Sequence, residues 1–360
     1  MDVKPKHIAI ICNYELLENR IGGMDYFFWA FNKKCLEKDI QIDWFFPNKA
    51  THGDYNKFNI VSDKNMSLEN SFISYIKYNV TNYTHVITHF IELCTSFFAS
   101  IKKEINTKII AIDHNPRPLN GYSLKKRIKK KLKGRLYGKY IDQFIGVSDY
   151  TSNTILNDFG NFLSFKTKTI CNGLDIEQYD KKDIFLHRNK FLTSSHLREE
   201  KGIQDLINAV LLLPVELSNK LVIEIYGNGP IKKKLMKMVE LNKLKHVISF
   251  KGSVMNLNTL YKEYDYLIHP SRGETFCYSV LEAIICNLPV ITTINNGNIL
   301  NLIKHNSNGF LHEEEDVVSL SNILMEILLG NKKIINVSND VLVKKFSLEK
   351  MVENHLKLLS

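Results

Sequence analysis

The segment SRGETFCYSVLEA carries two carboxylates, Glu274 and Glu282, with seven residues between them. It overlaps the end of YLIHPS, a short apolar run that predicts a β-strand. Glu274 therefore falls at the carboxyl end of this strand, where parallel sheets bind their ligands. Carboxylate oxygens accept hydrogen bonds from hydroxyl groups, so this pair suits a sugar or a ribose. Glu282 lies among apolar residues, where a carboxylate without a partner is costly.

Thr275, Phe276 and Cys277 stand at the start of the helix that is predicted over 279–286, and their backbone N–H groups suit an anion. If the segment is helical throughout, eight residues at about 100° each place both acids on one face. If Glu274 lies in a loop, both acids can still point into one pocket. The alternative is structural, with Glu274 as a helix N-terminal charge and Glu282 solvated.

Two further loops could bind phosphate. Lys201 precedes Gly202 at the start of a predicted helix, where an ammonium group and backbone amides could meet a diphosphate together, and His196 and Arg198 lie just before it. Gly22-Gly23 follows the first predicted strand and lets a ligand approach the backbone closely. A solvated charged loop and a plain turn are the alternatives.

Short β-rich segments alternate with helical patterns along the chain, which predicts an α/β protein with parallel sheets covered on both faces. The strands are expected at 7–12, 41–46, 85–90, 108–114, 143–148, 190–195, 221–227, 247–252, 266–271 and 289–293. The series restarts after residue 190, so we expect two Rossmann-like domains facing each other across a cleft. Their expected bounds are 1–170 and 191–340, with a linker at 171–190 and a C-terminal helix within 341–360 that could return to the first domain.

The composition is that of an ordinary soluble protein, with 44% hydrophobic and 24% charged residues. Six cysteines show no CxxC pair, which indicates buried thiols in a reducing compartment. The N-terminal apolar run is too short for a signal peptide, and no run is long enough for a spanning helix. We therefore expect a cytoplasmic protein. The net charge of +10 indicates an acidic partner, such as a nucleic acid, a membrane surface or a phosphorylated substrate.

The motifs together resemble those of the retaining glycosyltransferases of family 4, which have the two-domain GT-B fold. Glu274 and Glu282 match the E-x7-E motif of that family. The other matching motifs occur in family order over nearly the whole chain: Gly22-Gly23, IDHNP, GVSDYTSN, CNGLDIEQY, KGIQDLINA, YGNGP and FKGSV.

The resemblance implies a role for each matching residue. The N-terminal domain would be on the acceptor side and the C-terminal domain would bind the nucleotide sugar. His114 and Glu274 would contact the transferred sugar, and Glu282 would accept from the ribose of the donor. Lys201 would neutralise the diphosphate, helped by the backbone N–H groups of Phe276, Cys277 and the Gly23 loop.

Two stretches depart from the family pattern. The family has an arginine where HLREEKG has His196, and Arg198 could substitute for it. A histidine is a weaker and pH-dependent partner for a diphosphate. The usual G-G-x-P-E loop survives loosely in NNGNILNLI, with Asn301 near the place of the acid.

The expected activity is retaining transfer of a sugar from a nucleotide-sugar substrate to a glycan or lipid-linked acceptor, in surface polysaccharide or glycolipid assembly. Charge on the departing diphosphate would be stabilised by cations and helix N-termini. No D-x-D motif is placed to bind a catalytic metal, so we expect no metal and no cofactor. The alternatives are another GT-B activity, a phosphorylase or an epimerase, and a basic nucleic-acid binder. Against the last, the basic run lacks interleaved aromatic residues and no standard nucleic-acid module is found.

A basic amphipathic helix is expected within 123–140, where nine Lys or Arg residues fall between Lys125 and Lys139 without an acid. Leu124, Ile128, Leu132, Leu136 and Tyr140 recur at every fourth position and form an apolar stripe. Such a helix is typical of a membrane-surface element, which would place the protein at the inner face of a membrane. The alternative is that the stripe packs on the N-terminal domain. The expected lipid contacts are Lys125, Lys126, Arg127, Lys129, Lys130, Lys131 and Lys133.

Overall fold

The computed structural model describes residues 6–79, 81–183, 185, 187–254, 256–294, 302–335 and 343–360. The chain divides into two compact units. Unit 1 comprises Met1–Leu174 and Phe346–Ser360, and unit 2 comprises Asp175–Lys345. The stretch 171–190, which we expected to be a linker, is thus divided between the units, and the C-terminal segment belongs to unit 1.

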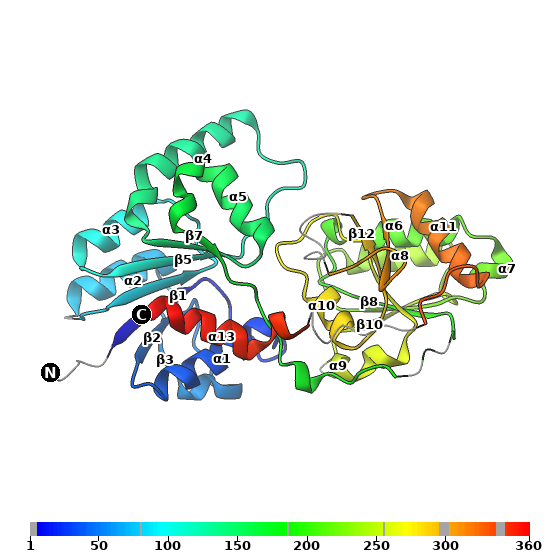
Figure 1. Cartoon of the computed structure of the whole chain (residues 1–360), viewed down its shortest axis with the longest axis horizontal. Coiled ribbons are helices and arrows are strands. Elements are labelled where there is room, and N and C mark those ends of the chain that lie inside the picture. The colour runs from blue at the N-terminus through cyan, green and yellow to red at the C-terminus, as the bar shows by residue number, and fades with distance from the viewer. Residues whose placement is uncertain are drawn as a thin grey trace. The chain divides into compact units, whose positions relative to one another are not determined.

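Unit 1 contains a seven-stranded sheet in the order β3-β2-β1-β4-β5-β6-β7, and every neighbouring pair is parallel. Its strands are β1 (His7–Cys12), β2 (Gln41–Phe45), β3 (Asn59–Val61), β4 (His85–His89), β5 (Lys108–Asp113), β6 (Gln143–Gly146) and β7 (Thr167–Thr169). Its helices are α1 (Gly23–Leu36), α2 (Leu68–Tyr78), α3 (Ser96–Glu104), α4 (Leu124–Tyr137), α5 (Asp149–Phe159) and α13 (Leu348–Leu356). Figure 1 shows α2 and α3 on one side of the strands, and α1 and α13 on the other.

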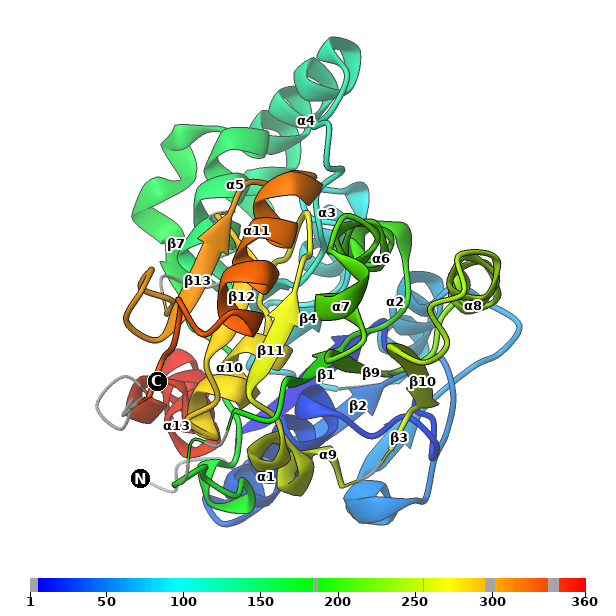
Figure 2. The same ribbon diagram turned by 90° about the vertical axis from the view of Figure 1, so that its right-hand side faces the viewer.

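Unit 2 contains a six-stranded sheet in the order β10-β9-β8-β11-β12-β13, which is again parallel throughout. Its strands are β8 (Lys190–Ser194), β9 (Val222–Tyr226), β10 (Ile248–Gly252), β11 (Tyr266–His269), β12 (Val290–Thr293) and β13 (Gly309–His312). Its helices are α6 (Ile203–Leu211), α7 (Val215–Ser218), α8 (Lys232–Leu241), α9 (Leu257–Leu260), α10 (Tyr278–Ile285) and α11 (Val317–Leu328). Figure 2 shows these elements from another side.

Apolar strands and amphipathic helices build the core of each unit. In unit 2, buried side chains of α6, α8 and α11 pack on the sheet in one cluster, among them Leu206, Leu235 and Leu324. Side-chain caps fix several helix starts, because a hydroxyl or carboxylate satisfies an N–H group that the helix leaves unpaired. Ser148 accepts from Thr151 N–H at the start of α5 in this way.

All ten predicted strands are present, and the predicted α/β fold with two parallel sheets is confirmed. Three strands were not predicted: β3, β7 and β13. Each has only three or four residues and lies at the edge of its sheet, so it has no long apolar run that the sequence could reveal.

The C-terminal helix α13 packs against α1. The ring of His355 lies 4.6 Å from the ring of Phe27, measured between centroids. The backbone N–H of Gly173 lies 3.2 Å from the sulfur of Met351. These contacts hold the last residues of the chain within unit 1.

The basic helix was predicted well in extent, since α4 covers Leu124–Tyr137. The buried residues of α4 are Lys130 and Gly134. Gly134 allows close packing on α5, because a Cβ there would lie 2.0 Å from the carbonyl oxygen of Phe159. Lys130 pairs with Asp158 at 3.2 Å. Contrary to our expectation, it is therefore not available to a lipid surface.

The apolar stripe of α4 faces solvent. Leu124, Ile128, Leu132 and Leu136 have exposed fractions of 71%, 53%, 52% and 60%. At about 100° per residue, the buried pair Lys130 and Gly134 lies on the opposite side of the helix. The alternative that the stripe packs on the N-terminal domain is therefore wrong. Tyr140 departs from the stripe, because it lies beyond α4 and is half-buried.

Candidate active site

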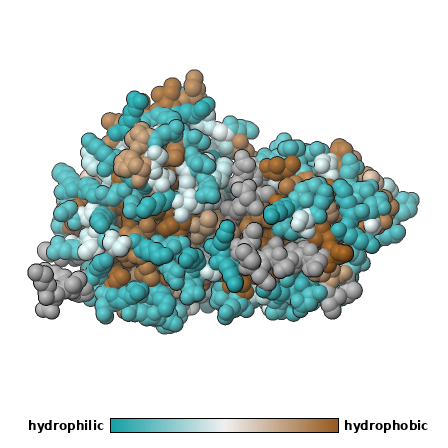
Figure 3. Space-filling view, viewed as in Figure 1, coloured by the Kyte–Doolittle hydropathy of each residue, from teal (hydrophilic) through white to brown (hydrophobic). Residues whose placement is uncertain are grey.

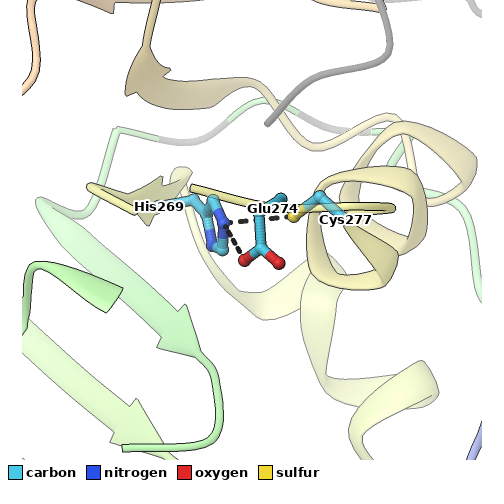
Figure 4. Close-up of side chains that lie close together, drawn as sticks. All are labelled: His269, Glu274 and Cys277. Carbon is cyan, nitrogen blue, oxygen red and sulfur yellow. Dashed lines mark hydrogen bonds and ion pairs between the residues drawn. The ribbon is translucent and has the colours of Figure 1, made fainter. Parts of the chain in front are cut away.

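The loop between β11 and α10 brings four side chains of unit 2 together. The ammonium group of Lys201 donates a hydrogen bond to Glu274 and forms an ion pair with it. Nε2 of His269, the last residue of β11, lies 3.2 Å from Oε1 of Glu274 and 3.1 Å from Sγ of Cys277. Figure 4 shows His269, Glu274 and Cys277 pointing toward one another. Lys201 and Glu274, which the sequence placed at separate motifs, are thus direct partners.

The electrostatics of this cluster keep Glu274 ionised. Burial opposes ionisation, but the charge of Lys201 and the hydrogen bond from His269 outweigh it and lower the pKa of Glu274 to about 2. Burial and the charge of Glu274 raise the pKa of the Cys277 thiol, and the charge of Glu282 acts in the same direction. The cluster therefore offers a fixed carboxylate charge beside an ammonium group and a neutral thiol.

The backbone around Lys201 explains why a glycine follows it. Gly202 has φ of +67°, which L side chains rarely adopt, and a Cβ there would lie 2.0 Å from the carbonyl oxygen of Pro270. Arg272 then fastens the same loop, because its guanidinium binds Asp205 of α6 at 2.8–3.0 Å and Glu315 at 2.6 Å. No role was predicted for Arg272, because its partners are distant in sequence.

Glu282 has partners of its own. It lies on α10, whose first residue is Tyr278, so Glu274 lies in the loop before the helix rather than on it. Tyr261 donates to Glu282 at 2.6 Å and Tyr179 at 3.4 Å. Burial raises the pKa of Glu282, and the two hydroxyl groups act against that shift. The cost of burying this carboxylate is thus met by hydrogen bonds, as its apolar neighbours in the sequence require.

The other residues of unit 2 that we expected to bind the donor lie in the segments that carry Lys201 and Glu274. Thr275 is partly buried, and Phe276 and Cys277 are buried just before α10. His196 and Arg198 are exposed, and the guanidinium of Arg198 lies 3.6 Å from the carboxylate of Glu200. Asn301 lies outside the described residues.

The glycine loop of unit 1 is held by a buried carboxylate. Asp25 accepts from Gly22 N–H at 2.9 Å, from Tyr14 at 2.9 Å and from Tyr55 at 2.7 Å. Helix α1 begins at Gly23. Gly22 has an extended backbone with φ of −146°, and a Cβ there would meet no described atom within 4 Å. Nothing within the described residues requires a glycine at position 22.

His114 follows β5 in unit 1 and belongs to a cluster of buried histidines. Its Nε2 lies 3.0 Å from Nδ1 of His89, and its ring stacks on Phe90 with centroids 4.2 Å apart. Burial and the neighbouring His355 lower the pKa of His114 to about 3, so its imidazole is neutral at pH 7. His89 was not predicted, because it resembles any polar residue at a strand end.

Sequence reasoning also missed other partners of the two acids. His269 stands five residues before Glu274 at the end of a predicted strand, so its position offered a signal. Tyr179 closes the motif CNGLDIEQY, which was recognised only as a segment. Tyr261 is distant in sequence from Glu282, and no local pattern pointed to it.

The segment that carries this cluster is similar to proteins of known family. Residues 175–339 match the family model for glycosyl transferases group 1. The chain is 32% identical over 181 residues to the GtfA subunit of the UDP-N-acetylglucosamine–peptide N-acetylglucosaminyltransferase of Streptococcus agalactiae, covering 49% of this chain and 35% of the relative. It is 26% identical over 168 residues to the poly(ribitol-phosphate) alpha-N-acetylglucosaminyltransferase of Staphylococcus aureus, covering 43% and 32%. The chain thus spans about a third of the length of these two relatives.

Solved structures show the fold of the whole chain. Anabaena HepE, solved in complex with UDP and glucose, superposes with a TM-score of 0.76 at 16% identity, covering 98% of this chain and 99% of HepE. All four residues of the cluster in unit 2 fall within the range matched by the family model. Residues 175–339 are therefore a group 1 glycosyl transferase domain, within a chain that has the GT-B fold.

Proposed function

We propose that this protein is a retaining glycosyltransferase that moves a sugar from a nucleotide-sugar donor to a glycan or lipid-linked acceptor. The observation that carries the proposal is the cluster of Lys201, Glu274 and His269 at the carboxyl end of β11. This is the edge where open α/β sheets bind their ligands. The relatives support it, since two of them are named for the transfer of N-acetylglucosamine.

In this proposal, each group of the cluster has a task in binding the donor. The ionised carboxylate of Glu274 accepts from hydroxyl groups of the transferred sugar. The ammonium of Lys201 turns to the diphosphate, whose charge grows as the bond to the sugar breaks. The backbone N–H groups at the start of α10 add to that stabilisation, and such preorganised donors are often the largest contribution to catalysis. Glu282 accepts from the ribose.

The chemical step needs no nucleophile from the protein. The acceptor attacks from the same face that the diphosphate leaves, and a diphosphate oxygen takes the acceptor's proton, which accounts for retention. The neutral imidazole of His114 contacts the transferred sugar. We propose that this step requires neither a metal ion nor a cofactor.

Glu282 provides the first test of this assignment. Glu282→Ala should weaken the binding of donor by about 1.5–3 kcal/mol, or roughly 10- to 150-fold, because a charged hydrogen-bond partner of the ligand is lost. Titration calorimetry with nucleotide sugars measures this directly. Tyr261→Phe is the control, since it removes the inner partner of Glu282 and spares its carboxylate. An unchanged affinity in a folded Glu282→Ala protein would remove Glu282 from the donor site.

Gly22 provides the second test. No described atom lies within 4 Å of a Cβ built at Gly22. We propose that a phosphate-bearing ligand approaches the backbone there. Gly22→Val should keep the melting temperature of the parent and weaken donor binding at least tenfold, with Gly22→Ala in between. If both variants bind donor as the parent does, the glycine loop is a plain turn.

The acceptor side of the proposal rests on α4. Exposed lysines flank its outward-facing apolar stripe, and hydrophobic atoms are visible at the surface where α4 lies, at the top of Figure 3. A pocket of about 410 Å³ is lined by Glu92, Ser123, Lys125, Lys126, Lys129, Lys130 and Lys133. We propose that α4 lies on an anionic membrane at its inner face, because apolar side chains can enter the lipid while the lysines bind headgroups.

No helix among the described residues is both long and apolar enough to cross a bilayer. In this proposal, α4 attaches the protein to the membrane surface. It suits a lipid-linked acceptor in the assembly of a surface polysaccharide or glycolipid. The relative named for poly(ribitol-phosphate) and the structural neighbour named as a lipopolysaccharide outer core galactosyltransferase support an acceptor of this kind.

A further inference from the structure

The cluster in unit 2 also has the composition of a metal site. One ring nitrogen of His269, one carboxylate oxygen of Glu274 and the sulfur of Cys277 all lie within 4.8 Å of one another. Among the residues that the structure describes, this is the one group of three such ligands. All three come from nine consecutive residues, the end of β11 and the loop that follows it, so their geometry depends on unit 2 alone.

The distances suit a tetrahedral ion. Zinc bonds of about 2.0–2.3 Å to nitrogen, oxygen and sulfur place neighbouring ligand atoms about 3.3–3.6 Å apart. The observed separations of His269 Nε2 from Glu274 Oε1 and Cys277 Sγ are 3.2 and 3.1 Å, so these two need shifts of only a few tenths of an ångström. The carboxylate of Glu274 and the sulfur of Cys277 lie within 4.8 Å of each other, and an ion would draw them to about 3.6 Å. Imidazole and thiolate ligands favour zinc and similar ions over magnesium or calcium, which prefer oxygen.

The charges also balance. A divalent ion with the carboxylate of Glu274 and the thiolate of Cys277 makes a neutral group, which reduces the cost of placing the ion in a buried site. The competing cation is the ammonium of Lys201, which now holds Glu274. The Lys201 side chain is 16% exposed, and its long stem lets the ammonium turn to solvent when an ion takes its place.

We propose that His269, Glu274 and Cys277 bind one zinc-like divalent ion, and that this ion inhibits the protein. On binding, the Cys277 thiol releases its proton to solvent, and the neutral ring of His269 carries its proton on Nδ1 instead of Nε2. The sulfur and His269 Nε2 then each donate a lone pair, and Glu274 exchanges the ammonium of Lys201 for the ion. No oxidant or reductant is needed. Inhibition rests on the proposed function, because the ion would occupy the carboxylate that we assign to the sugar. Binding of the ion does not.

Cobalt(II) tests the binding by itself, since it replaces zinc in such sites and thiolate ligation gives an intense ultraviolet charge-transfer band. Titration of the reduced full-length protein should give this band with one equivalent of cobalt, and zinc should abolish it. The band should be lost in Cys277→Ser and weakened in His269→Gln. Lys201→Met should bind the ion at least tenfold more tightly, because the competing ammonium is gone. This variant tests the site without removing a ligand.

Cys171→Ser is the matched control, because Cys171 is the one cysteine that is not buried and is the main rival source of a cobalt–thiolate band. It should keep the band. Absence of the band in the parent, or its persistence in Cys277→Ser, would overturn the metal site. A band without inhibition of nucleotide-sugar turnover by zinc would retain the site but refute the inhibition. A protein that binds cobalt and turns over no nucleotide sugar would place the failure in the proposed function instead.

Discussion

Glu274→Gln lowers the rate of sugar transfer about 100- to 1,000-fold in our account, and the affinity for nucleoside diphosphate does not fall. Glutamine keeps the size of the side chain and loses its charge. The transferred sugar changes shape and charge most in the transition state, so a group that contacts it acts on turnover more than on binding. The magnitude is that of removing one preorganised electrostatic contact in an active site. Steady-state kinetics and titration with nucleoside diphosphate separate the two effects.

Glu315→Gln is the matched control for this change. Glu315 is an exposed carboxylate that binds Arg272 of the same loop, so its substitution removes one charge nearby without touching Lys201. It should leave the rate unchanged. Equal losses of rate and nucleotide affinity in Glu274→Gln would indicate a simple binding role. An unchanged rate would remove Glu274 from the chemistry.

The second large effect concerns α4. Replacing Lys125, Lys126, Lys129 and Lys131 together with glutamine should reduce binding to anionic vesicles by about three orders of magnitude at low salt. Each basic residue near an anionic surface contributes about 1 kcal/mol, and all four are exposed. Cosedimentation with phosphatidylglycerol vesicles at low and high salt measures the effect, and high salt should abolish binding of the parent.

A charge-matched control separates the helix from the net charge of the protein. Replacing the exposed Lys233, Lys234, Lys237 and Lys243 of unit 2 with glutamine lowers the net charge by the same four units. This variant should bind vesicles as the parent does. Ile128→Ser with Leu132→Ser should weaken binding through the apolar stripe. Equal binding by the two lysine variants, or no binding by the parent at low salt, would contradict membrane attachment through α4.

The sequence predicted the strands with long apolar runs, because such runs have few alternatives to a buried parallel sheet. It also predicted that the segments with Lys201 and Glu274 follow strands of one sheet, and these two side chains are in contact in the structure. It did not predict which side chains pair across those loops. The contact between Lys201 and Glu274 joins residues 73 positions apart, and it depends on how Gly202 packs under Pro270.

The direction in which the apolar stripe of α4 faces could not be predicted either. The fourfold spacing in α4 predicted a stripe but left open whether it faces the unit or solvent. Tertiary packing decided this, because Gly134 is small enough to lie against the backbone of Phe159, and Asp158 provides a partner for Lys130. A glycine within a lysine-rich helix is a signal for such close packing, and it was not used.

The most direct test of the proposed activity is to incubate the protein with a panel of nucleotide sugars and follow them by proton NMR. Our account predicts that at least one donor releases its nucleoside diphosphate, that the product first appears with the anomeric configuration of the donor, and that Glu274→Gln loses this activity while Glu315→Gln keeps it. If no nucleotide sugar in a full panel is bound or cleaved, or if the product appears with inverted configuration, the proposal of a retaining glycosyltransferase is contradicted.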